Sequence, residues 1–75
     1  MLGDELKKAR EEADLTQEKL SFAAEIDRSY ISLLENNRQS PTVDLLFRLC
    51  DAMGVSASDL IRRVEAGRKQ KPKKK

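Results

Sequence analysis

The apolar residues of this chain recur at the spacing of helices, and no segment shows the alternation that is typical of a half-buried strand. In the N-terminal segment they return every three or four residues, which places them on one face of a helix. These residues are Leu2, Leu6, Ala9 and Ala13. We expect this helix to end at Asp14, because aspartate tolerates the backbone geometry of a turn.

Two short helices are predicted next, each preceded by a residue that can cap its first turn. The second helix covers Gln17–Ala24 after Thr16, and the third covers roughly Arg28–Glu35 after Asp27. Only Glu25-Ile26-Asp27 separate them. Because two short helices with so short a connection cross steeply, this segment predicts a helix-turn-helix unit.

The C-terminal half predicts two further helices. Thr42 caps a fourth helix, which ends at Gly54, since glycine adopts the left-handed conformation that follows many helices. Ser56 with Asp59 three residues later resembles the capping box of a fifth helix, which ends near Gly67. We therefore expect an all-α protein with one compact five-helix domain over residues 1–67.

Apolar side chains on the inner faces of these helices predict one shared core. The candidates in the second and third helices and their connection are Leu20, Ala24, Ile26, Ile31 and Leu34. The apolar face of the fourth helix consists of Val43, Leu46, Leu49, Cys50 and Met53. The fifth helix has apolar positions at Leu60, Ile61 and Val64. Residues 68–75 are rich in lysine and, apart from one proline, entirely polar, so we expect a basic, disordered tail there.

The composition limits the chemistry of this domain. With no histidine and one cysteine, we expect no internal disulfide, no metal site and no cofactor. The absence of a Gly-rich phosphate loop and of a nucleophile with an evident base argues against an enzyme. No apolar run is long enough to cross a membrane, and the acidic N-terminus is unlike a secretion signal, so we expect a cytoplasmic protein.

Positive charge is distributed unevenly along the chain. Residues 62–75 carry eight basic side chains and one acidic side chain, whereas residues 1–61 carry seven basic and twelve acidic side chains. A nucleic-acid-binding face within the folded part must therefore concentrate its few positive groups locally.

Several linked motifs resemble those of the phage repressor and Cro type of helix-turn-helix protein, also called the xenobiotic-response-element family. The matching runs are Leu15-Thr16-Gln17-Glu18, Asp27-Arg28-Ser29-Tyr30-Ile31-Ser32, Leu34-Glu35-Asn36, Ser40-Pro41-Thr42 and Ala52-Met53-Gly54-Val55-Ser56. The resemblance extends over about residues 2–65. It implies a transcriptional regulator that binds double-stranded DNA. The short chain is similar to the controller proteins of restriction-modification systems, and a phage or plasmid repressor fits almost as well.

The chain departs from this family at the turn between the second and third helices. Glu25 stands where the family usually has glycine, which suits a left-handed conformation, so either Glu25 accepts the strain or the turn is rebuilt. Asn37 replaces a common glycine after the third helix, a smaller change because asparagine tolerates a positive φ. Arg10 and Glu35 match a family pair that often forms a salt bridge between the first and third helices.

The surface of the third helix opposite its apolar residues is the candidate for reading DNA bases. It carries Arg28, Ser29, Ser32 and Leu33. Arg28 can donate to two acceptors of guanine, the serines can bond a base or a phosphate, and Leu33 can contact a thymine methyl group. The alternatives are a solvated Arg28 and a Leu33 that belongs to the core. By resemblance, Gln17 at the start of the second helix also reaches a base.

A second group of residues is expected to hold the DNA backbone. It comprises Thr16, Gln17, Tyr30, Asn36, Asn37 and Arg38. Free N–H groups at the start of a helix favour a phosphate, and the residues after the third helix adjoin the base-reading surface. For Tyr30, the alternative is a ring that packs on the second helix.

One recognition helix reads only a few base pairs, so we expect a homodimer that binds a (pseudo)palindromic operator. The candidate dimer interface consists of Val55, Ala57, Leu60, Ile61 and Val64. Because the chain leaves no room for a ligand-sensing domain, no small-molecule effector is expected. The alternative function is a protein-interaction module of the same fold, such as an antitoxin-like subunit.

Overall fold

The computed structural model describes residues 2–68, which form five α-helices and no strand. The helices are α1 (Leu2–Glu12), α2 (Gln17–Ala24), α3 (Arg28–Glu35), α4 (Val43–Met53) and α5 (Ala57–Gly67). This confirms the expected all-α, five-helix fold. The predicted basic tail lies outside the described residues except for Arg68, which is the C-cap residue directly after α5. Within the described range, no helix is long and apolar enough to cross a membrane.

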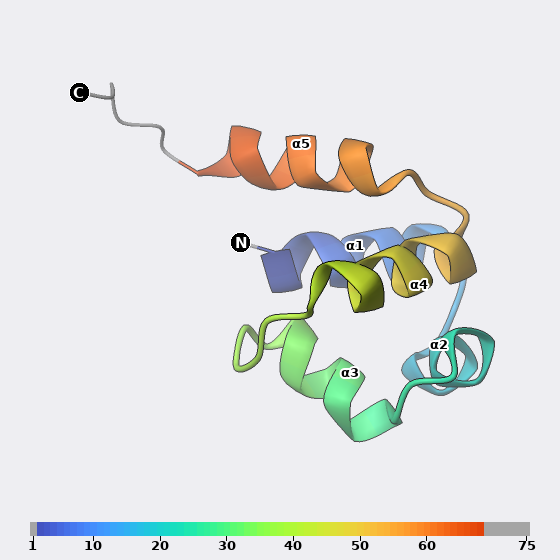
Figure 1. Cartoon of the computed structure of the whole chain (residues 1–75). Coiled ribbons are helices and arrows are strands. Elements are labelled where there is room, and N and C mark those ends of the chain that lie inside the picture. Colours follow the sequence, from blue (N-terminus) through green and yellow to red (C-terminus); the bar gives the residue numbers. More distant parts are fainter. Residues whose placement is uncertain (1, 69–75) are drawn as a thin grey trace.

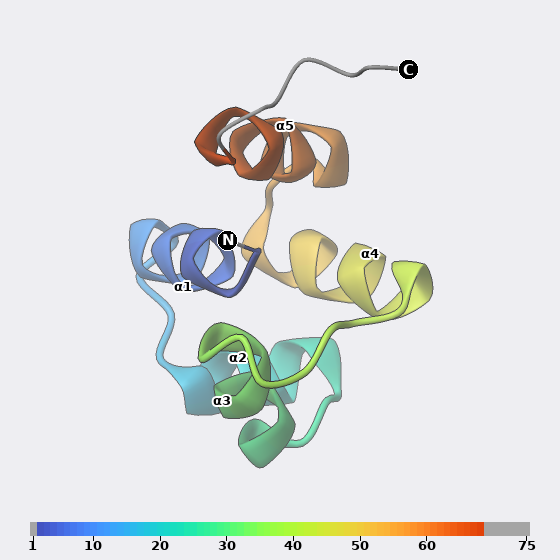
Figure 2. The ribbon, with the colours of Figure 1, turned by 90° about the vertical axis from the view of Figure 1, so that its left-hand side faces the viewer.

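The helices are arranged in three levels (Figure 1). α1 and α4 form the middle level, α5 lies on one side of them, and α2 and α3 lie on the other, as the perpendicular view also shows (Figure 2). α1 contacts α3 and α5, whereas α4 contacts α2 and α5. The middle level therefore connects the helix-turn-helix unit to α5.

Three of the four predicted N-terminal caps are formed. The Thr16 hydroxyl accepts a hydrogen bond from the Lys19 N–H group at 3.0 Å, and the Thr42 hydroxyl accepts one from the Leu45 N–H group at 3.1 Å. At Ser56 the corresponding bond measures 3.4 Å. The prediction for Asp27 is wrong in this respect: Asp27 precedes α3, but its side chain makes no capping hydrogen bond.

The core contains apolar side chains from all five helices. Its buried members are Leu6, Ala9, Leu20, Ala24, Ile31, Leu34, Leu46, Leu49, Cys50, Met53 and Leu60. Burial, with a smaller contribution from the Asp51 charge, raises the pKa of the Cys50 thiol, so this cysteine stays neutral. The prediction of Val43 as a core residue is wrong, since it is 66% exposed and the buried stripe of α4 begins one turn later at Leu46.

A close approach between α1 and the end of α3 depends on Gly3, which the sequence pattern did not single out. A Cβ atom on Gly3 would lie 2.7 Å from the Glu35 carbonyl oxygen and would also collide with the Leu34 carbonyl oxygen. The Gly3 N–H group donates to Asn37 Oδ1 at 2.9 Å. Asn37 has a φ of 61°, as expected for the residue that replaces glycine there.

Candidate nucleic-acid interface

α3 turns one face to the core and presents the opposite face to solvent. Ile31 and Leu34 are 1% and 2% exposed, and together they hold the helix against its neighbours. On the other face, Arg28 and Ser29 are exposed and Ser32 is half-buried. The short spacing of apolar residues in α3 therefore fixes which polar residues lie outward.

Four of the five candidate base-reading residues line one hollow in the surface. Gln17 comes from the first turn of α2, and the α3 residues are Arg28, Ser29 and Ser32. The hollow has a volume of about 270 Å³. Leu33 does not line it, but it is 38% exposed and thus is not a core residue. The structure therefore brings residues from both helices of the helix-turn-helix unit to one surface.

A buried ion pair connects α1 to the end of α3. Arg10 donates from Nε to Glu35 Oε2 at 2.7 Å and from Nη2 to Glu35 Oε1 at 3.0 Å. These hydrogen bonds raise the pKa of Arg10, against the opposing effect of burial. A third bond, from Nη1, reaches the Leu15 carbonyl oxygen at 2.8 Å. The predicted pair is thus confirmed, and the guanidinium also holds the loop before α2.

Gln17 is bound to the same carboxylate. Its Nε2 atom donates to Glu35 Oε1 at 3.0 Å, which leaves the amide oxygen of Gln17 as an acceptor beside the hollow. The sequence did not predict this contact, because Gln17 and Glu35 are eighteen residues apart. Glu35 therefore fixes the orientation of a candidate DNA-contacting side chain as well as that of Arg10.

The candidate backbone-contacting residues have varied surroundings. The Thr16 hydroxyl is occupied as the α2 cap, and the Tyr30 side chain packs against the core and donates from its hydroxyl to the Ser40 carbonyl oxygen at 3.5 Å. Asn36 folds back to donate to the Ser32 carbonyl oxygen at 2.9 Å. Asn37 is bonded to Gly3, as described above, and Arg38 is exposed after α3.

The turn between α2 and α3 keeps a left-handed residue although it has no glycine. Glu25 has φ 58° and ψ 47°. Of the two alternatives that the sequence left open, the strained left-handed conformation of Glu25 is therefore the one observed, and the turn is not rebuilt. Arg48 from α4 donates to backbone oxygen atoms of this turn. No sequence signal distinguishes Arg48 from other surface arginines, because its partners lie more than twenty residues earlier in the chain.

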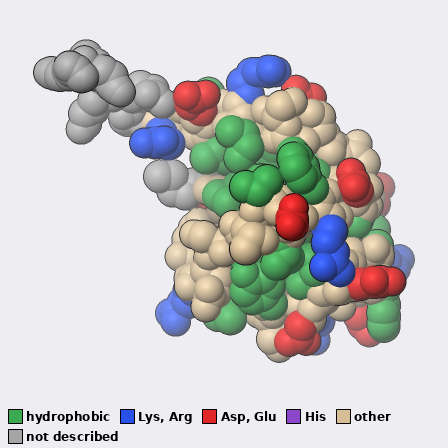
Figure 3. Space-filling model, in the orientation of Figure 1, with side chains coloured by type: hydrophobic (Ala, Val, Ile, Leu, Met, Phe, Trp, Pro, Cys, Tyr) green, Lys and Arg blue, Asp and Glu red, His purple; other side chains and the backbone are tan. Residues whose placement is uncertain are grey.

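The candidate dimer residues do not form one uniform surface. Leu60 is 2% exposed within the core of its own chain, so its assignment to a surface is wrong. Ile61 is 43% exposed, and Val55, Ala57 and Val64 are half-buried. Hydrophobic side chains are visible at the surface where α5 meets the helices beside it (Figure 3).

The arrangement of the five helices agrees with the comparison to known families. Residues 6–60 match the family described as Helix-turn-helix. The chain therefore belongs to the helix-turn-helix family of Cro/C1-type transcriptional regulators.

Two similar proteins are named as regulators. The chain is 36% identical over 61 residues to the uncharacterized HTH-type transcriptional regulator y4dJ of Sinorhizobium fredii. The matched segment covers 81% of this chain and 79% of that protein. It is 33% identical over 64 residues to the control protein C.MunI of a Mycoplasma species, and the match covers 84% of this chain and 86% of that protein.

Solved structures of regulators have the same fold. The clp gene regulator ClgR of Corynebacterium glutamicum superposes with a TM-score of 0.83 at 29% identity, over 87% of this chain and 69% of that chain. SinR is a master regulator for biofilm formation, and its structure was solved in complex with DNA. It superposes with a TM-score of 0.77 at 29% identity, over 81% of this chain and 98% of that chain.

Proposed function

We propose that this protein is a sequence-specific, double-stranded-DNA-binding transcriptional regulator that acts as a homodimer on a (pseudo)palindromic operator. The observation that carries the proposal is the hollow in which Gln17 of α2 joins Arg28, Ser29 and Ser32 of α3. Polar side chains on one exposed face of a short helix are what readout in a major groove requires. A regulator of this kind performs no catalysis.

Arg28 is the main base-reading residue in this proposal. It lies in the first turn of α3, and its exposed guanidinium can donate to O6 and N7 of one guanine. Ser29 and Ser32 contribute shorter donors and acceptors on the same face. Leu33, exposed beside them, supplies an apolar contact to a thymine methyl group.

The DNA backbone is held on either side of this reading face. The N-terminus of α2, with Thr16 and Gln17, offers N–H groups to one phosphate. Arg38 and the backbone of Asn36 and Asn37 bind the phosphates beyond the end of α3, and Tyr30 contributes its hydroxyl. These contacts position the helix, whereas the base contacts give the specificity.

Ile61 is the centre of the proposed dimer interface, with Val55, Ala57 and Val64 around it. An exposed isoleucine on the last helix is a suitable apolar contact for a two-fold partner. Because two recognition helices read two half-sites, dimerisation multiplies the specificity of each. The protein concentration then sets the occupancy of the operator without a small-molecule effector.

The test compares a selected operator with scrambled DNA. Bound sites are selected from random duplexes with the wild-type protein, and affinities for operator and scrambled DNA are then measured across a salt series. Arg28→Ala should reduce the preference for the operator by roughly 1–3 kcal/mol per half-site contact. Lys8→Ala, which removes an exposed charge from α1, is the matched control and should leave this preference unchanged.

The result has two informative alternatives. If Arg28→Ala weakens both DNAs equally, Arg28 is a phosphate contact and the reading face is assigned wrongly. If the wild-type protein selects no sequence at all, the protein-interaction module becomes the better interpretation of this fold.

A further inference from the structure

The connection between α2 and α3 contains a strained residue that needs external support. Glu25 lies in the left-handed region, at φ 58° and ψ 47°, where a side chain with a Cβ atom is disfavoured. Such a conformation persists only when surrounding contacts impose it. On the α2 side, the N–H groups of Glu25 and Ile26 both donate to the Ser21 carbonyl oxygen.

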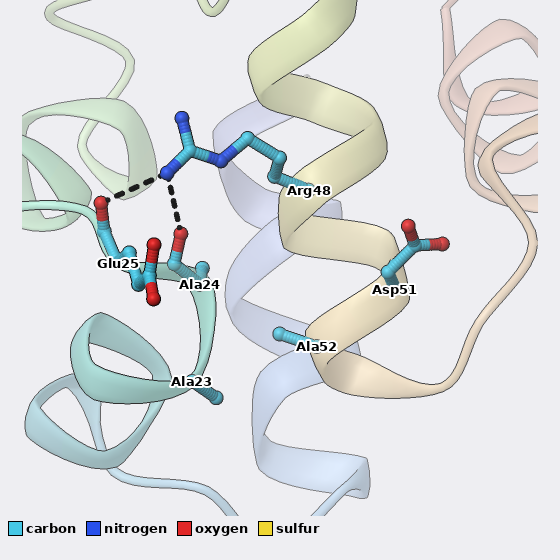
Figure 4. A pocket seen from close by; sticks show the side chains of 6 residues that line it. All are labelled: Ala23, Ala24, Glu25, Arg48, Asp51 and Ala52. Atoms are coloured by element: carbon cyan, nitrogen blue, oxygen red, sulfur yellow. Dashed lines mark hydrogen bonds between the residues drawn. The ribbon is translucent and has the colours of Figure 1, made fainter.

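The opposite side of the turn is held by an arginine from another helix (Figure 4). Arg48 of α4 donates from Nη2 to the Ala24 carbonyl oxygen at 3.0 Å and to the Glu25 carbonyl oxygen at 3.1 Å. The last carbonyl groups of a helix lack partners within the helix and carry partial negative charge, so a cation is favourable there. One guanidinium therefore binds two successive carbonyl oxygens, that of the last residue of α2 and that of the residue after it.

This contact lies away from the proposed reading face. Arg48 lines a hollow of about 310 Å³ with Ala23, Ala24, Glu25, Asp51 and Ala52, none of which lines the hollow that contains Arg28. These two hydrogen bonds of Arg48 thus go to the backbone of the turn and not to the proposed reading face. The turn sets the angle between α2, which carries Gln17, and α3, which carries Arg28.

We propose that Arg48 is a positioning residue for DNA readout: by holding the left-handed turn at Glu25, it fixes α3 relative to α2 so that both helices present one reading surface. This inference rests on the proposed function for its DNA readout, but the clamp itself is a property of the free protein. The side chain of Arg48 lies at the surface, so replacing it opens no cavity in the core.

The first measurement uses the protein without DNA. Arg48→Met keeps most of the aliphatic length of the side chain and removes the donors. Loss of these charge-assisted bonds should lower the hydrogen-exchange protection of the Ile26 amide by about tenfold, while core amides such as that of Leu49 are less affected. Arg48→Lys retains a cationic donor and should recover part of this protection.

The second measurement is a double-mutant cycle on operator preference. Arg48→Met should reduce the ratio of operator to scrambled-DNA affinity by about tenfold, whereas Lys8→Met, which also removes one exposed positive charge, should leave the ratio unchanged. Glu25→Gly relieves the strain and keeps both carbonyl acceptors. In the Glu25→Gly background, Arg48→Met should therefore reduce the ratio of operator to scrambled-DNA affinity much less than it does in the protein that retains Glu25.

The outcomes separate the clamp from the proposed function. Unchanged exchange at Ile26 in Arg48→Met would overturn the clamp, whatever the DNA results. Equal losses on both DNAs, or the same loss with and without Glu25→Gly, would show that Arg48 contributes only charge and would overturn its role in readout. A wild-type protein without sequence preference would refute the proposed function and the readout role with it, while the exchange result would still decide the clamp.

Discussion

Glu35 places one buried carboxylate at the end of α3, where it contacts two side chains from other helices. It accepts two hydrogen bonds from Arg10 and one from Gln17, and it thereby connects α1 and α2 to α3. The side chains of Arg10 and Glu35 are 10% and 3% exposed, so each charge depends on the other for its solvation.

Removing one member of this pair leaves a buried charge without its partner. Glu35→Ala should lower the free energy of unfolding by about 3–5 kcal/mol, as measured by urea denaturation. Glu12→Ala is a matched control, because it breaks an exposed ion pair with Arg63 at 3.5 Å and should cost less than about 1 kcal/mol. Similar values for the two variants would show that the Arg10–Glu35 pair is effectively solvated.

Gly3 gives the second residue-scale prediction, and its sign is unusual. Alanine normally stabilises a helix relative to glycine, but at position 3 the added Cβ atom meets backbone oxygen atoms of α3. Gly3→Ala should therefore destabilise the protein by about 1–3 kcal/mol in a thermal or urea unfolding experiment. Gly67→Ala is the control, since nothing lies within 4 Å of its Cβ position. A neutral Gly3→Ala would mean that α1 shifts easily away from α3.

At the scale of the elements, the short helices differ in how their first turns are capped. Thr42 accepts a capping hydrogen bond at the start of α4, whereas Asp27 at the start of α3 makes none. α3 is thus held mainly by its buried face and by the contacts at its ends. This agrees with the rule that a helix of eight residues has little stability of its own.

The caps can be compared directly by substitution. Thr42→Ala should reduce the free energy of unfolding by about 0.5–2 kcal/mol, because an N–H group of α4 loses its acceptor. Asp27→Ala should cost clearly less, since no side-chain bond is lost. Both values come from urea denaturation of the two single variants. An equal or larger loss for Asp27→Ala would show that the aspartate caps α3 in solution.

At the scale of the whole molecule, the three levels separate two surfaces. The proposed reading face lies on the α2–α3 side of the middle level, and α5 with Ile61 lies on the other side (Figures 1 and 2). α5 is also held to α1 by two ion pairs of Arg63. Its Nη1 atom lies 3.8 Å from Glu5 Oε1, and its Nη2 atom lies 3.5 Å from Glu12 Oε1. This separation is compatible with the proposed function, in which one surface contacts a second protomer while the other contacts DNA.

Ile61→Asp tests this division of surfaces. A charge in an apolar two-fold contact should weaken dimerisation by about tenfold or more in sedimentation equilibrium, and operator binding should weaken with it. Phe22→Asp, at a side chain that is 75% exposed on α2, is the control and should leave the dimer intact. A wild-type protein that stays monomeric at high concentration, with and without operator, would exclude the homodimer.

The sequence by itself determined the features that depend on neighbouring residues. The bounds of α2 and α3, the caps at Thr16 and Thr42, and the positive φ of Gly54 follow from local patterns, because periodicity and capping act within a few residues. The exposed face of α3 was predictable for the same reason, since Ile31 and Leu34 fix the orientation of the helix.

The tertiary structure alone decided what depends on residues far apart in the chain. The contact of Gln17 with Glu35 and that of Arg48 with the Glu25 turn join elements about twenty residues apart. Only the packing of helices showed that position 3 needs glycine, that Leu60 is core and that Val43 is exposed. Helical periodicity places an apolar residue on a face of its own helix, but the neighbouring helices determine how much of that face is covered.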